Sequence, residues 1–120
     1  MNNNSKQEII LVNFLQSWKE KDWNKMFQSC QKTWQNNHSL DGVTFLESYY
    51  CLKNLKKWKI IKIKSISNVC IDIKLKIEYG INGYSERKKI KARIICESEP
   101  YKTDINGNWG VNPISILKEN

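Results

Sequence analysis

The sequence predicts an α+β domain in which three N-terminal helices pack on a curved, cone-like sheet of four antiparallel strands. In the first half of the 120-residue chain the apolar side chains recur with a helical period, whereas in the second half they alternate with polar ones. Asn82-Gly83, the strongest short hairpin signal, interrupts the alternating part. A chain of this length fits one domain over residues 1–120, with residues 1–4 as a flexible lead-in.

Three helices are expected before the first strand. The first begins at a capping box formed by Ser5 and Glu8, and Asp22 and Asp41 are suitable N-caps for the second and third. Each helix then carries one apolar face. The three faces are Ile10, Leu11, Phe14, Leu15 and Trp18, then Trp23, Met26, Phe27, Cys30 and Trp34, and finally Phe45, Leu46, Tyr49, Tyr50 and Leu52.

A long hairpin is the best-defined part of the predicted sheet. Strict alternation over residues 69–79 predicts a half-buried strand, and a two-residue Asn-Gly turn sets its pairing with the returning strand. This register places Leu75 opposite Ile90 and Asp72 opposite Arg93, so apolar residues meet on one face and opposite charges on the other. A slip by one residue would destroy both patterns.

Two further strands are expected beside this hairpin. One covers residues 58–66, where isoleucines alternate with lysines. The other covers residues 107–116, after a turn at residues 104–107. Pro113 lies within this last strand, which implies an edge position, a bulge or the end of the strand.

Three local signals accompany this order of elements. They are Leu15 and Trp18 followed by Lys21-Asp22-Trp23 at the first helix junction, the alternating hairpin of residues 69–97, and the turn of residues 104–111 with Trp109. Together they resemble the nuclear transport factor two-like (cystatin-like α+β cone) superfamily. The resemblance implies a cone whose sheet curls around the first helix and leaves an apolar pocket at the open end. Members include isomerases, hydrolases, dehydratases and protein-binding modules, so the fold alone does not decide the chemistry.

No residue is assigned a catalytic or metal-binding role. The resemblance implies that an enzyme of this superfamily would hold a carboxylate base inside the pocket, but the hairpin register directs Asp72, Glu78 and Glu97 outward. The four cysteines form no Cys-x-x-Cys pair, and His38 has no partner at ligand spacing. Neither a metal nor another cofactor is expected.

The chain has an excess of positive charge, and part of it is predicted to lie on the outer face of the sheet. The formal net charge is +8, and the register places Lys74 opposite Lys91 and Lys76 opposite Lys89. This block has two interpretations: a solvated surface that deters aggregation, or a docking site for an acidic protein or a nucleic-acid backbone. Base stacking is disfavoured because no aromatic residue interleaves with the lysines. Codons rich in A and T, which encode Lys, Asn and Ile, are an alternative source of the basicity.

The sequence therefore favours a non-catalytic binding or assembly module of the superfamily. It would bind an acidic protein partner through the basic sheet face, or a small apolar ligand in the cone pocket. The alternatives are a small-molecule isomerase or dehydratase and an electrostatic nucleic-acid binder. The candidate basic-face residues are Lys74, Lys76, Lys89 and Lys91, and the candidate pocket residues are Tyr49, Tyr79 and Trp109.

The start of the sequence and the length of its apolar runs indicate where the protein is located. The chain opens with a polar stretch instead of a signal peptide, and no apolar run approaches the ~20 residues that span a bilayer. A cytoplasmic protein without membrane contact is expected. Because the opposed lysines would repel a second copy, we expect a monomer, or a dimer formed through another surface.

Overall fold

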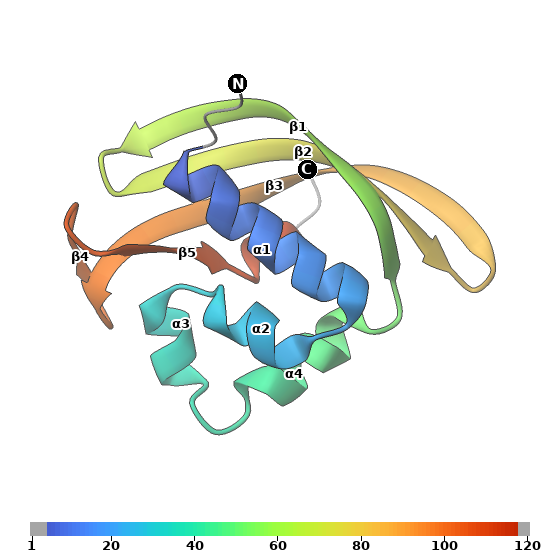
Figure 1. The fold of residues 1–120 in the computed structure, drawn as a ribbon, viewed down its shortest axis with the longest axis horizontal. Coiled ribbons are helices and arrows are strands. Elements are labelled where there is room, and N and C mark those ends of the chain that lie inside the picture. The colour runs from blue at the N-terminus through green and yellow to red at the C-terminus, as the bar shows by residue number, and fades with distance from the viewer. Residues whose placement is uncertain (1–4, 118–120) are drawn as a thin grey trace.

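The computed structural model describes residues 5–117 and has an α+β architecture (Figure 1). Residues 1–4, the expected lead-in, lie outside the described part. The helices are α1 Lys6–Glu20, α2 Trp23–Gln28, α3 Lys32–Asn37 and α4 Gly42–Tyr50. The strands are β1 Asn54–Ser67, β2 Cys70–Ile81, β3 Tyr84–Glu99, β4 Lys102–Thr103 and β5 Asn108–Asn112, followed by a 3-10 helix, η1, at Ser115–Leu117.

The three long strands arch over α1, and the shorter helices lie beyond it (Figure 1). The sheet order is β1-β2-β3, with β4 and β5 both pairing with the far edge of β3. The core lies between the concave side of the sheet and α1, whose Leu11, Phe14 and Leu15 are fully buried. None of the helices within residues 5–117 is long and apolar enough to cross a membrane.

Helix α1 begins and ends as its sequence predicts. The Glu8 backbone N–H donates to Ser5 Oγ at 3.2 Å, and Ser5 Oγ donates to the Glu8 carboxylate at 3.4 Å. At the other end Lys21 adopts a left-handed conformation with φ 58°, and its N–H bonds to the Trp18 carbonyl. Trp18 donates its indole N–H to the Lys53 carbonyl at 2.9 Å, which ties α1 to the start of the sheet.

The single helix expected over residues 22–34 is wrong, because the structure contains α2 and α3 instead. Cys30, between them, forms a parallel bridge with Val111. The Gln31 N–H donates to the Val111 carbonyl at 2.9 Å, and the Val111 N–H donates to the Ser29 carbonyl at 2.8 Å. Backbone groups that would continue the helix therefore pair with β5. The four helices thus replace the expected three.

Helix α4 confirms the third expected helix, with two local differences. Asp41 occupies the N-cap position, but its side chain makes no capping bond and lies 3.4 Å from His38 Nδ1. Leu52, expected on the apolar face, lies beyond the end of the helix and is 73% exposed. The adjoining Tyr50 is buried and donates its hydroxyl to the Pro113 carbonyl at 2.6 Å.

The β2–β3 hairpin has the predicted register throughout. Leu75 lies opposite Ile90 and Asp72 opposite Arg93. The turn residues Asn82 and Gly83 both have positive φ, 51° and 80°, as a type I′ turn requires. The lysines of the polar face, including Lys74 and Lys91, are exposed.

The remaining strands differ in extent from their predictions. β1 is longer than the expected 58–66 because it pairs with β2 along almost the whole length of that strand. The last strand ends at Asn112, so Pro113 marks its end, and residues 115–117 turn into η1. The two-residue β4 adds a fifth strand to the expected four.

Candidate functional site

The outward side chains of β1, β2 and β3 form a regular charged array, which we call the basic face. Antiparallel pairing places them in four rows, because directly opposed residues share one face of a sheet. The face holds ten cationic and two anionic side chains, and this excess of eight equals the formal net charge of the whole chain. The rows are Lys57·Glu78·Arg87, Lys59·Lys76·Lys89, Lys62·Lys74·Lys91 and Lys64·Asp72·Arg93.

The two outer rows carry their own counter-charges. Arg87 Nε donates to the Glu78 carboxylate at 3.1 Å. Arg93 donates two hydrogen bonds to the Asp72 carboxylate, one from Nε at 2.9 Å and one from Nη2 at 3.0 Å. The hydrogen bonds from Arg93 hold the pKa of the Asp72 carboxyl below its usual value, against the opposing effect of burial. Asp72 is therefore ionised and neutralised at neutral pH.

The two middle rows consist only of lysines. All six are exposed, and none forms an ion pair within residues 5–117. They include the four lysines singled out from the sequence, which the structure brings together, and two more from β1. The strongest uncompensated charge of the face therefore lies at its centre.

The contribution of β1 was only partly visible in the sequence. A register irregularity between Ile60 and Lys62 shifts the alternation by one residue, so that Lys57 and Lys59 before it face the same way as lysines after it. Lysines at odd positions followed by lysines at even positions are the sequence signal of this bulge.

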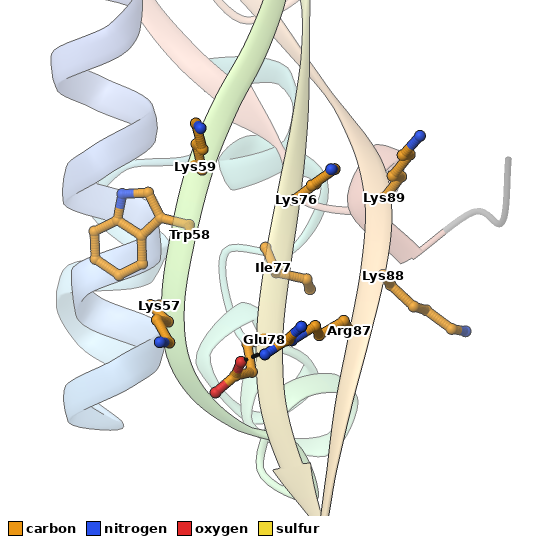
Figure 2. A pocket seen from close by; sticks show the side chains of 9 residues that line it. All are labelled: Lys57, Trp58, Lys59, Lys76, Ile77, Glu78, Arg87, Lys88 and Lys89. Atoms are coloured by element: carbon orange, nitrogen blue, oxygen red, sulfur yellow. Dashed lines mark hydrogen bonds and ion pairs between the residues drawn. The ribbon is translucent and has the colours of Figure 1, made fainter.

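A hollow of about 450 Å³ opens on one part of the basic face (Figure 2). Lys59, Lys76 and Lys89 stand side by side on β1, β2 and β3, beside the Glu78–Arg87 pair. The row Lys62·Lys74·Lys91 lies outside it. The remaining residues that line the hollow are Lys57, Trp58, Ile77 and Lys88.

A second cavity, also of about 450 Å³, lies where the ends of α1 and α4 meet the inner side of the sheet. We call it the cone-mouth cavity. Its apolar lining includes Trp18, Ile77, Tyr79 and Ile90, and no carboxylate lines it within the described part of the chain. Lys53 Nζ lies 5.0 Å from the centre of the Tyr79 ring, which is a cation–π contact.

The structure does not bring the three candidate pocket residues together. Tyr79 lines the cone-mouth cavity and is 4% exposed. Trp109 lines a different cavity, of about 530 Å³, beside the α2–α3 junction. Tyr49 is 41% exposed and stacks on Phe45 at 5.8 Å between ring centres. Of the three, Tyr79 alone belongs to the cone mouth.

Glu97, which the hairpin register directs outward, is buried instead of exposed to solvent. It is only 3% exposed, because the segment that links α2 to α3 covers it. Glu97 Oε1 accepts from the Thr33 N–H at 3.0 Å and from Gln31 Nε2 at 3.3 Å, and its Oε2 accepts from the Thr33 hydroxyl. The carboxylate thus satisfies the first turn of α3, which is a structural role.

The cysteine side chains behave as small apolar groups and not as reactive thiols. All four cysteines are free, and burial raises the pKa values of Cys30, Cys70 and Cys96. A protonated thiol is a poor nucleophile. Within residues 5–117, no group of three or more His, Cys, Asp or Glu side chains is placed to hold a metal ion.

Comparison with known proteins shows the fold. A SEC-C motif containing protein from Psychrobacter arcticus has a TM-score of 0.65 and 8% identity, over 87% of this chain and 56% of that one. An NTF-2 like protein of unknown function from Shewanella oneidensis MR-1 has a TM-score of 0.61 and 13% identity, over 88% of this chain and 91% of that one. No family model and no curated protein matches the sequence. The chain therefore has the NTF2-like fold that its sequence resembles.

Proposed function

We propose that the chain is a non-catalytic binding module whose basic face docks an acidic protein surface. The observation that carries this proposal is the pair of all-lysine rows, six exposed ammonium groups without a described acidic partner. Like charges on directly opposed strand residues destabilise a sheet by roughly a few tenths of a kcal/mol for each pair. An acidic partner removes this repulsion and gains the attraction of all six charges, so its binding also stabilises the fold.

The spacing of the rows suits an extended acidic segment. Successive rows lie two residues apart along each strand, or about 6.7 Å, and neighbouring strands are about 4.8 Å apart. Carboxylates on one face of an extended peptide repeat at the same distance of about 6.7 Å. Such a peptide, lying along the strands, can set its carboxylates against successive lysine rows.

Nucleic acid is the less favoured partner for this surface. Arg87 and Arg93 are the only arginines of the chain, and both are already bonded to carboxylates. None of the twelve side chains in the four rows is aromatic, so the rows offer bases no stacking platform. What remains for nucleic acid is attraction to the phosphates alone.

Nuclear magnetic resonance mapping tests this choice of partner. The ¹⁵N-labelled chain is titrated with an oligo-glutamate peptide and, separately, with a single-stranded oligonucleotide of equal charge. The proposal expects the peptide to shift the amide signals of β1–β3 and to bind more tightly than the oligonucleotide. Peptide shifts scattered over the helices would contradict it, and so would tighter oligonucleotide binding with the steep salt dependence of phosphate contacts.

A second candidate function is the binding of a small apolar ligand in the cone-mouth cavity. The observation that favours it is the cavity's lining of Trp18, Tyr50 and Tyr79 without a carboxylate in the described part of the chain. The described lining offers no carboxylate to serve as the base that an isomerase or dehydratase of this superfamily would hold beside its ligand. We expect Tyr79→Phe to change the affinity of the fluorescent probe anilinonaphthalene sulfonate, measured by its emission. An unchanged affinity would count against this site.

A further inference from the structure

We propose that the hollow on the basic face is a binding site for a small oligophosphate, an anion with several phosphate groups close together. This goes beyond the docking of an acidic protein, since it assigns a compact ligand to one part of the face. It rests on a difference between two lysine rows of equal charge. Lys59, Lys76 and Lys89 line the hollow, whereas the neighbouring row does not.

Cations from three strands line this hollow. Lys57 and Lys59 come from β1, Lys76 from β2, and Lys89 from β3. In Figure 2 the side chains of Lys59, Lys76 and Lys89 stand beside one another, one on each strand. Neighbouring strands are about 4.8 Å apart, so one compact anion can reach ammonium groups on two or three strands. A carboxylate of a single side chain brings only one negative charge to the same place.

The one carboxylate in the hollow does not oppose an anion. Glu78 accepts the hydrogen bond of Arg87 at 3.1 Å, and its side chain is 18% exposed, so its charge is compensated and largely covered. Lys59, Lys76 and Lys89, which line the hollow beside this pair, keep the local charge strongly positive. A volume of about 450 Å³ is within the usual range for small-molecule sites.

Lysine side chains are suited to an oligophosphate, whereas a planar anion such as a carboxylate is better matched by arginine. Its ammonium is a point charge on a flexible stem with three donors, which can follow phosphate oxygens of varied geometry. Phosphate groups offer several acceptor oxygens each, and charge-assisted hydrogen bonds to them are short and strong. Several phosphates in one ligand are needed because separate exposed ion pairs contribute little each.

Calorimetric titration with inorganic tripolyphosphate tests the site, at a constant ionic strength of about 150 mM, with sulfate as the comparison anion. The chain offers matched variants on the same two strands. Lys76→Ala with Lys89→Ala removes an opposed pair inside the hollow, and Lys74→Ala with Lys91→Ala removes an opposed pair outside it. Both double variants relieve the same repulsion and change the net charge equally.

We expect tripolyphosphate to bind the native chain more tightly than sulfate does. The hollow variant should lose about tenfold in affinity and the outside variant about twofold or less. Equal losses in the two variants would overturn the inference, because the anion would then sense only the overall charge. Binding no tighter than that of sulfate would overturn it as well. If oligo-glutamate still bound the face in either case, the proposed function would stand.

A second pair keeps the test valid if a double variant fails to fold. Lys59→Ala and Lys62→Ala are single changes on β1, both at exposed positions, with only Lys59 in the hollow. The inference expects a weaker affinity for Lys59→Ala than for Lys62→Ala. The reverse order would overturn it.

Discussion

At the scale of single residues, Asp72 is a carboxylate that is buried and yet paired with a cation, Arg93. Asp72 is 6% exposed and accepts both bonds of the guanidinium. The pair closes one end of the basic face, as Glu78 and Arg87 close the other. Because Glu78 is paired with an exposed arginine, its bond is the weaker of the two.

This pair makes the stability of the chain depend on pH. Arg93 lowers the pKa of Asp72 in the folded state, so the folded chain holds its proton less tightly than the unfolded chain, where the pKa is about 3.9. The stabilisation is complete above that value and is lost as the pH falls toward the folded pKa. Asp72→Asn should cost about 1.5–3 kcal/mol of unfolding free energy near neutral pH.

Urea unfolding at several pH values checks this prediction. The deficit of Asp72→Asn should shrink as the pH falls below about 4, because the unfolded carboxyl then binds a proton that the folded carboxyl still resists. Glu78→Gln is the matched control and should cost less than about 1 kcal/mol. A deficit of Asp72→Asn that stays constant down to acid pH would contradict the assignment.

At the scale of elements, the hairpin and the α2–α3 break show what the sequence can and cannot predict. The β2–β3 register depends on a local turn and on pairs such as Leu75 with Ile90, so it could be predicted in full. The break at Cys30 depends on Val111, a residue far along the chain, and no local pattern indicates it. The burial of Glu97 could not be predicted either. The groups that bind its carboxylate belong to Gln31 and Thr33, which lie far from it in the sequence.

The close approach of β5 to this break is tested at Gly110. A Cβ atom there would lie 2.4 Å from the Gln31 Cα, a distance that requires the backbone to move. We expect Gly110→Ala to lower the free energy of unfolding by about 1–3 kcal/mol, as overpacking does. Gly80→Ala is the control, since the nearest atom to its Cβ would be Lys56 Cε at 3.4 Å, an ordinary van der Waals contact. Equal costs in denaturant unfolding would show that the contact is not tight.

At the scale of the whole molecule, charge is segregated onto one side of the sheet. The basic face accounts for the entire formal excess of the chain, so the helices and loops together are neutral. Such segregation creates a field that attracts anionic surfaces and repels another copy of the same face. The sequence indicated the lysines of β2 and β3, but because of the bulge in β1 it did not indicate that Lys57 and Lys59 belong to the same face.

The oligomeric state of the chain is expected to depend on this distribution of charge. Packing two basic faces together would bury six unpaired lysines from each copy, at a cost of several kcal/mol for each buried ion. We expect a monomer, or a dimer formed through another surface, in light scattering coupled to size-exclusion chromatography. A dimer in which the side chains of the two middle lysine rows are buried at the interface would contradict this expectation.

The most direct test of the basic face reverses its central charges. Lys74→Glu with Lys91→Glu changes one opposed pair, and Lys6→Glu with Lys102→Glu makes the same net change at exposed positions outside the face. The measurement is the affinity of each variant for oligo-glutamate, by fluorescence anisotropy. We predict a loss of about tenfold or more for the first variant and about twofold or less for the second, with both folded. Equal losses would show that only net charge matters and would contradict a docking role for this face.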